Sequence, residues 1–271
     1  MKPFISRILR DRTISWFLII FVLAFGLRLA RAMIDDNMDK DSVIYLWMAE
    51  AAASGDINGA VAYNQRMPPL YVAIMAAGEH AGVGAYNTGI IVSLVAGTLL
   101  LLPVFWIARM LANDKIALFA ALIVATHPYL VRISAEVMRD SLFLLLVFAG
   151  FAFAVAAARE ISPFRWILPG IFAGLAVMTR TEGVELIVAA LIWSVLEIYL
   201  AGRAGGIRPA LKKAAFSCLL VVASFLMVTM PVQILLSSSQ SSWGPVDERV
   251  AGYFREFKDQ SKNEVKEMEK R

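Results

Sequence analysis

The sequence predicts an all-α integral membrane protein with about seven transmembrane helices and interfacial helices in the first outer loop. Hydrophobic residues make up 59% of the 271 residues and the mean hydropathy is +0.67. A typical soluble domain is only about half apolar. The excess is concentrated in runs that approach the roughly 20 apolar residues needed to cross a bilayer. These observations exclude a soluble globular domain as the main interpretation.

Seven apolar runs are the predicted spans, at residues 16–29, 90–111, 117–130, 141–157, 166–177, 184–200 and 214–235. The stretch 70–81 is too short to span and contains Glu79 and His80, so we expect it to lie at the membrane surface. Residues 1–236 are predicted to form the polytopic membrane domain. Residues 237–271 are predicted to be an extracytoplasmic linker, which contains "SSSQSSWGP", and a charged helical tail.

The basic residues of the short loops predict a cytoplasmic N-terminus. Twelve lysines and arginines fall on that side and seven on the other, and the loop "GRAGGIRPALKK" is the richest. We therefore expect a multi-pass protein of the cell membrane. The start of the chain, with its basic residues, apolar middle and "ARA" at 30–32, also fits a cleaved signal peptide, although Arg28 and Arg31 crowd that cleavage site.

Ionisable side chains gather in the predicted outer loops, where their cost near a membrane invites a functional explanation. The first loop holds Asp35, Asp36, Asp39, Asp41, Glu50 and Asp56, the second His127, Arg132, Glu136, Arg139 and Asp140, and the third Arg180 and Glu182. A carboxylate can take a proton from an attacking hydroxyl, and an arginine can stabilise a leaving phosphate. Together with an interfacial helix that could line a lipid groove, these groups fit sugar transfer from a lipid phosphate. That reaction is one of several that the residues alone allow.

Four short motifs occur in order along these loops. They are "DSVIY" with Asp41 and Tyr45, "SGD" ending at Asp56 followed by "PPLY" at Pro68–Tyr71, "VMRDSLF" with Asp140, and "TRTEG" at Thr179–Gly183. In this order the chain resembles, over about residues 15–236, the N-terminal half of the polytopic GT-C glycosyltransferases. This superfamily includes protein O-mannosyltransferase-like and aminoarabinose-transferase-like enzymes. The chain departs from the usual "TRPEG" turn at Thr181, which replaces a proline.

The resemblance implies a site and a reaction. Asp41 would be the base that activates an acceptor hydroxyl, and Asp140 would support the acceptor or Asp41. Either Arg139 or Arg180 would face the phosphate of a polyprenyl-phosphate sugar donor, and transfer would invert the sugar. Further candidates for substrate binding are Tyr45, Tyr71, Glu136 and Glu182. The acceptor is expected to be a lipid, a glycan or a protein.

Each of these residues also has a purely structural interpretation. Asp41 and Asp140 could cap helices, and Asp39 competes with Asp41 as the catalytic acid. The arginines could anchor spans at headgroups. Glu136 could pair with Arg132 or Arg139. Similarly, Glu182 could cap a helix, and the tyrosines, with Trp47, could belong to an aromatic belt. The histidines His80 and His127 are expected to form interfacial hydrogen bonds.

The sequence also allows two other functions. Relatives usually continue through several more spans, so the chain could be a non-catalytic half whose partner is a second polypeptide with the remaining spans. A transporter or flippase-like protein is the other alternative. No cofactor is certain, although acids in the first two outer loops could hold Mg²⁺ or Mn²⁺. The single cysteine, Cys218, excludes an internal disulfide, and the net charge of +4 does not indicate a nucleic-acid partner.

Overall fold

The described part of the chain is helical throughout. The computed structural model describes residues 12–34, 38–63, 68–159, 163–203 and 207–237, and these contain no strand. The α-helices are α2 (Arg12–Ile34), α3 (Lys40–Ala53), α4 (Ile57–Tyr63), α5 (Leu70–His80), α6 (Ala85–Leu99), α7 (Leu101–Leu111), α8 (Asp114–Thr126), α9 (Pro128–Ile133), α10 (Asp140–Ala158), α11 (Ile167–Val177), α12 (Glu185–Arg203) and α13 (Ile207–Ser237). Short 3₁₀ helices η1 (Pro163–Trp166) and η2 (Thr181–Val184) precede α11 and α12. Asp35, Asp36, Arg66 and the predicted tail at 238–271 lie outside the described residues.

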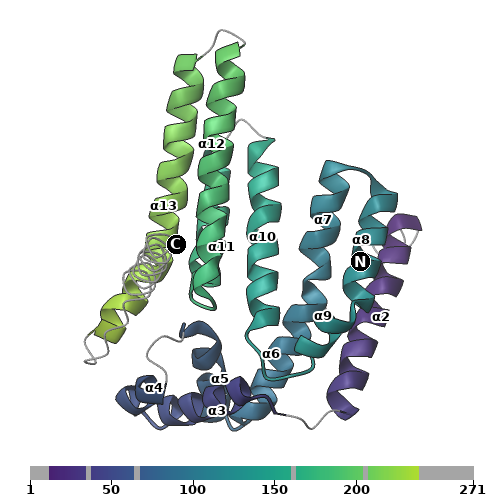
Figure 1. The fold of residues 1–271 in the computed structure, drawn as a ribbon, viewed down its shortest axis with the longest axis vertical. Helices are drawn as coiled ribbons and strands as arrows, with labels where there is room; N and C mark the ends of the chain where they lie inside the picture. The colour runs from purple at the N-terminus through teal and green to yellow at the C-terminus, as the bar shows by residue number, and fades with distance from the viewer. Residues whose placement is uncertain (1–11, 35–37, 64–67, 160–162, 204–206, 238–271) are drawn as a thin grey trace, which may run out of the picture.

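The long helices stand side by side and three short ones lie across one end of them (Figure 1). In space α2 packs on α8, α8 on α7, α7 on α10, α10 on α11, and α11 on α13. Helices α3, α4 and α5 cover the end at which α10 begins (Figure 1). We call this the α3–α5 end, and the other the opposite end.

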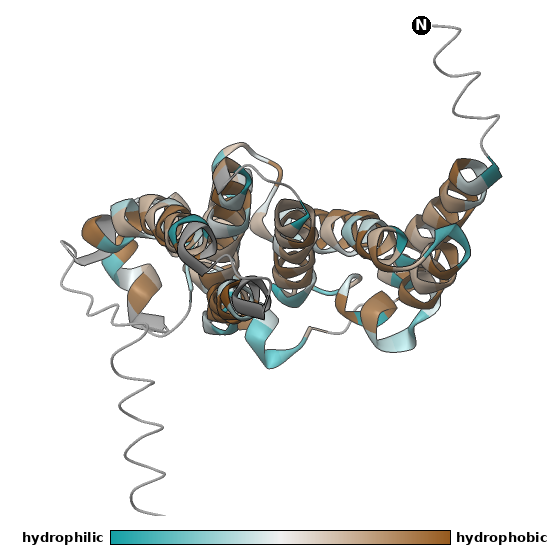
Figure 2. Cartoon of the chain, turned by 90° about the horizontal axis from the view of Figure 1, so that it is seen from above, coloured by the Kyte–Doolittle hydropathy of each residue, from teal (hydrophilic) through white to brown (hydrophobic). Residues whose placement is uncertain are grey.

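The apolar character of the upright helices makes the chain an all-α integral membrane protein. Four segments of the described residues are long and apolar enough to cross a membrane: Arg12–Ile34, Ala85–Leu111, Asp140–Ala158 and Leu211–Ile234. Seen from above, the helices of the row are mostly brown, the apolar colour (Figure 2). Large apolar side chains such as Ile19, Val22 and Met227 are exposed on them, as lipid contact requires. The other three predicted spans are also helical, but α8 and α11 have only 13 and 11 residues. Seven spans therefore remain a prediction.

The second predicted span is built from two helices in line. Helix α6 ends at Leu99 and α7 begins at Leu101, two residues before Pro103. A proline has no N–H to donate and its ring crowds the preceding turn, so it interrupts a helix near its own position. Helix α6 reaches the α3–α5 end, where it packs against α5 and α3 (Figure 1).

A buried cluster fixes the short helices beneath the bundle. Tyr45 and Met48 of α3 pack with Tyr71 and Met75 of α5, and Val137 joins them from the loop before α10. Burying one such side chain contributes about 1.5–3 kcal/mol. The segment at 70–81 was predicted to be a helix at the membrane surface, and α5 is a short helix at the α3–α5 end (Figure 1). Its place at the membrane surface stays a prediction.

Candidate functional site

Two tyrosines form the centre of the candidate site. The rings of Tyr45 and Tyr71 meet edge to face, with centroids 5.5 Å apart, and both side chains are buried. The Tyr71 hydroxyl lies 3.0 Å from the Gly89 carbonyl, to which it donates, and 3.0 Å from Ser93 Oγ. This contact ties α5 to α6. Burial raises the pKa of Tyr71, so its phenol keeps the proton that it donates to the Gly89 carbonyl.

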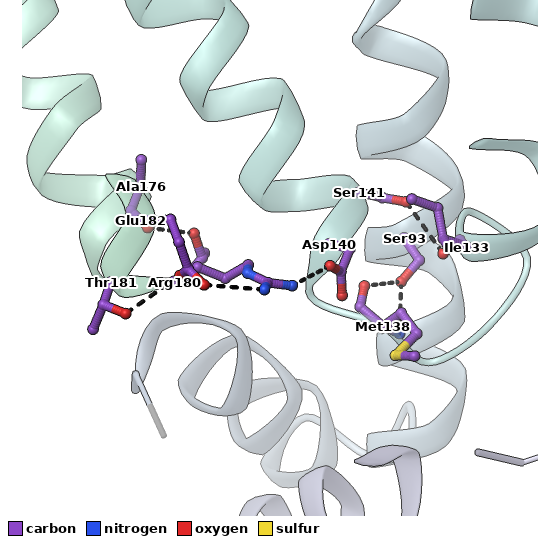
Figure 3. Close-up of polar contacts among 10 residues, drawn as sticks. Ser93, Ile133, Met138, Asp140, Ser141, Ala176, Arg180, Thr181 and Glu182 are labelled. Carbon is purple, nitrogen blue, oxygen red and sulfur yellow. Dashed lines mark hydrogen bonds and ion pairs between the residues drawn. The ribbon is translucent and has the colours of Figure 1, made fainter. Parts of the chain in front are cut away.

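The loop before α10 is held from two sides by serine hydroxyls. Ser42 Oγ of α3 donates to the Val137 carbonyl at 3.0 Å, and Ser93 Oγ of α6 donates to the Met138 carbonyl at 2.9 Å. Figure 3 shows the Ser93 contact beside the start of α10. Arg139 and Asp140 directly follow this loop. The two bonds therefore hold the backbone from which both side chains extend.

An ion-pair network joins the start of α10 to η2. The Arg180 guanidinium lies between Asp140 and Glu182 (Figure 3), with its Nη2 atom 3.2 Å from Glu182 Oε1 and an ion pair to Asp140 through Nη1. Burial lowers the pKa of Arg180, but the bond to Glu182 and the charge of Asp140 outweigh burial and raise it. Burial likewise raises the pKa of Glu182, but the bond to Arg180 holds that pKa below its usual range. The network therefore carries charge on Arg180 and Glu182 at neutral pH.

A pocket of about 300 Å³ opens beside this network. Its lining residues are Tyr129, Ile133, Asp140, Phe143, Leu144, Arg180, Glu182 and Glu185. Three carboxylates and one arginine face a space walled by aromatic and aliphatic side chains. Carboxylates and an arginine offer acceptors and donors for hydroxyl groups, so this pocket suits a small polar ligand.

Arg139 has a different environment from Arg180. Its Cζ atom lies 5.9 Å from the centroid of the Tyr45 ring, which is the geometry of a cation–π contact. Its Nε and Nη1 atoms are buried and, among the described residues, have no hydrogen-bond partner. A buried donor without a partner costs about 1–3 kcal/mol and more when it is charged, so this guanidinium is suited to an anionic partner.

Several charged candidates influence the Tyr45 hydroxyl electrostatically. Burial raises the pKa of Tyr45 to about 12; the charge of Arg139 opposes this rise, and the charges of Asp41 and Asp140 add to it. At neutral pH the phenol is therefore protonated and is not a general base. Asp41 lies four residues before Tyr45 on α3, so the two share one face of that helix. Arg139, whose guanidinium lies over the Tyr45 ring, directly precedes Asp140 at the start of α10.

The position of Asp41 separates it from the neighbouring acid. Asp39 is the N-cap of α3, where its carboxylate accepts a hydrogen bond of 2.7 Å from the Lys40 N–H. Asp41 lies in the first turn, is exposed, and forms no hydrogen bond or ion pair with any other described residue. The capping role considered for Asp41 thus belongs to Asp39, and the Asp41 carboxylate is accessible to a ligand.

Most of the chain matches a known protein family. Residues 66–234 match the dolichyl-phosphate-mannose-protein mannosyltransferase family, which is more than half of the 271 residues. The chain belongs to this family. Membership confirms the resemblance to GT-C glycosyltransferases and makes the chain a membrane glycosyltransferase of the mannosyltransferase type. A search of curated proteins gives no match.

Two motifs that are far apart in the sequence meet in the structure. The Leu70 N–H of "PPLY" donates to the Met178 carbonyl just before "TRTEG", at 2.8 Å. The family match includes "PPLY", Asp140 and "TRTEG", whereas Asp41 and Tyr45 precede residue 66. The contacts of α3 and α5 bring these earlier residues to the matched part.

The glycine of "TRTEG" is required by close packing. A Cβ atom on Gly183 would lie 2.5 Å from the Val177 nitrogen and 2.6 Å from the Ala176 carbonyl carbon, both in the backbone. We expect Gly183→Ala to lower the free energy of unfolding by about 1–3 kcal/mol, because the turn must move. Thermal unfolding in detergent measures this change. Gly26→Ala is the control, since nothing lies within 4 Å of its added Cβ, and an equal loss there would contradict the explanation.

Of the structural roles considered for the other candidates, the ion pair of Glu136 is present and the helix caps are not. Glu136 pairs with Arg132 at 3.6 Å, as the structural alternative expected. Glu182 is not an N-cap, because Arg180 is the N-cap residue of η2. Asp140 is not an N-cap either, because Arg139 is the N-cap residue of α10 and makes no side-chain cap bond. Among the described residues, no group of three or more His, Cys, Asp or Glu side chains gathers in a way that could hold a metal ion.

Sequence reasoning missed several residues of the candidate site. Ser42 and Ser93 hold the loop before α10, and Tyr129, Phe143 and Glu185 line the pocket. Glu185 follows "TRTEG" by two residues and could have been found as a further acid near that turn. The two serines carry no such signal, since serine is common on buried helix faces and their partners are far away in the sequence.

Proposed function

We propose that this mannosyltransferase-family protein moves a sugar from a polyprenyl-phosphate donor to an acceptor hydroxyl on the extracytoplasmic face of the cell membrane, with inversion. The observation that carries the proposal is the Arg139 guanidinium, partly unpartnered among the described residues, over the ring of Tyr45, which shares a face of α3 with the exposed Asp41 at the α3–α5 end. The positive-inside pattern supports placing that end outside the cell. Lipid-linked donors are typical of the family, which favours this function over that of a transporter.

In the proposed step the acceptor oxygen attacks the anomeric carbon as the bond from that carbon to the phosphate oxygen breaks. The bonding electrons leave with polyprenyl phosphate, and the acceptor proton passes to the Asp41 carboxylate. General-base catalysis of this kind contributes about 10²–10⁴-fold to the rate. Attack from the face opposite the leaving phosphate inverts the anomeric configuration.

Of the two arginines that the sequence left open, Arg139 is the better candidate to face the phosphate. Arg180 already pairs with Asp140 and Glu182, so an added phosphate would compete with two carboxylates. Arg139 offers two buried donors without a described partner. A bond from a guanidinium to phosphate is charge-assisted and about twice as strong as a neutral hydrogen bond.

The pocket beside Arg180 is proposed to hold the hydroxyl-bearing groups that react. Asp140 lines this pocket, and we assign it to positioning the acceptor. Glu182 and Tyr71 act through their neighbours: Glu182 orients Arg180, and Tyr71 supports the ring of Tyr45. The acceptor is a hydroxyl of a lipid, a glycan or a protein.

The experiment is a transfer assay with the purified chain. Radiolabelled polyprenyl-phosphate mannose is incubated with the protein in detergent and with a membrane extract that supplies acceptors. We expect label to leave the lipid phosphate and appear in an acid-stable product. Movement of the labelled lipid across proteoliposome membranes without transfer would favour a flippase instead. Transfer that requires an added second polypeptide would assign the chain to a split enzyme.

A further inference from the structure

A second pocket lies at the opposite end of the bundle, far from the candidate active site. It has a volume of about 630 Å³ and lies where α7 turns into α8 (Figure 1). Its lining residues are Arg109, Ala112, Asn113, Asp114 and Lys115. No predicted function uses this pocket.

The charges around this pocket are mostly positive. Asp114 is the one carboxylate of its lining, and it accepts hydrogen bonds from Arg109 Nε at 2.8 Å and Thr13 Oγ1 at 3.0 Å. Lys115 is exposed and forms no salt bridge with the described residues. Arg159, the C-cap of α10, adds a cation at the rim, because its Nη2 donates to the Met110 carbonyl at the end of α7. Arg109 thus pairs with Asp114, and Lys115 and Arg159 add two further cations near the pocket.

An apolar strip leads from this pocket along the lipid-facing side of α7. Leu102 and Trp106 are 45% and 38% exposed and lie four residues apart, so they share one helix face. Arg109 follows Trp106 by three residues, about 4.5 Å along the axis. The Trp106 ring packs edge-on against Phe153 of α10, with centroids 5.4 Å apart, which closes one side of the strip.

We propose that this pocket binds the headgroup phosphate of an anionic phospholipid, with an acyl chain lying along Leu102 and Trp106. Basic pockets beside membrane helices attract anionic headgroups at the bilayer surface. The strip accounts for the choice of a lipid, because a soluble anion has no apolar part to place against Trp106. By the positive-inside pattern this end faces the cytoplasm, so the lipid belongs to the inner leaflet.

Quenching of tryptophan fluorescence by brominated lipids tests this proposal. The whole chain in mixed micelles is titrated with brominated phosphatidylglycerol or with brominated phosphatidylcholine at equal mole fractions. We expect stronger quenching by the anionic lipid, and we expect Trp106→Phe to abolish the excess. Lys115→Gln is expected to weaken the apparent affinity for the anionic lipid about fivefold, the usual contribution of one basic residue at a membrane surface.

The matched control is Lys212→Gln, an exposed lysine at the same end of the bundle on α13. It removes the same charge away from the pocket and is expected to leave quenching unchanged. Equal quenching by the two lipids, or an equal effect of both lysine variants, would overturn the proposal. Displacement of the brominated lipid by inorganic phosphate at millimolar concentration would also overturn it and indicate a soluble-anion site.

Discussion

Replacement of Asp41 by asparagine is expected to lower kcat for sugar transfer by about 10²–10⁴-fold, with little change in folding. The expected loss is that of a general base, because the amide cannot accept the proton of the acceptor hydroxyl. Folding is expected to be preserved because Asp41 is exposed and bonds to no other described residue. Initial rates from a labelled polyprenyl-phosphate sugar, with thermal unfolding measured beside them, check both expectations.

Asp39→Asn is the matched control for this variant. The two acids lie two residues apart, but Asp39 caps α3 through the Lys40 N–H. Asparagine caps helices about as well as aspartate, so this change is expected to leave both stability and transfer nearly unaltered. Full activity of Asp41→Asn would exclude it as the base, and a large loss in Asp39→Asn alone would transfer that role to Asp39.

Arg139→Gln is expected to weaken binding of polyprenyl phosphate, the leaving product, by about 10–150-fold. This range corresponds to the roughly 1.5–3 kcal/mol of a hydrogen bond to a charged group. The lost interaction strengthens as the phosphate leaves, so kcat is expected to fall as well. Product inhibition of transfer measures the binding, and circular dichroism checks that the helices remain.

Arg180→Gln provides the contrast. It leaves Asp140 and Glu182 without their common cation, so the expected effect is a loss of stability around η2. Inhibition by polyprenyl phosphate is expected to change little, because this arginine is already occupied by carboxylates. Weaker inhibition in Arg180→Gln than in Arg139→Gln would reverse the assignment of the two arginines.

The sequence was sufficient to predict the helical membrane fold. Apolar runs predicted α2, α10 and α13 well because each is one uninterrupted helix. The sequence was less informative for the spans predicted at α8 and α11, because these helices have only 13 and 11 residues. Hydropathy averages over a window and does not report where the backbone hydrogen bonds of a helix end.

The sequence predicted which residues belong to the candidate site, but not which of them form ion pairs with one another. Their positions in the predicted outer loops indicated Asp140, Arg180 and Glu182 as candidates. The structure joins these three side chains in one ion-pair network. Local pattern could not decide between Asp39 and Asp41, since either can begin a helix. Nor could it separate Arg139 from Arg180, because the carboxylate that occupies Arg180 is 40 residues away.

The tyrosines show why burial was hard to foresee. An aromatic residue near a predicted membrane surface fits an exposed belt, yet Tyr45 and Tyr71 are buried against each other. Their burial results from α3 packing on α5, a contact between segments that α4 and its flanking loops separate in the sequence. The hydroxyl of Tyr71 could be buried because Gly89 and Ser93 of α6 satisfy it.

The most direct test of the proposed mechanism is the anomeric configuration of the transferred sugar. The purified chain is supplied with a polyprenyl-phosphate sugar of known β configuration, and the product is examined by NMR before further processing. Direct attack by a hydroxyl that Asp41 activates predicts an α-linked product. A β-linked product would require a covalent intermediate or another route and would contradict the role assigned to Asp41.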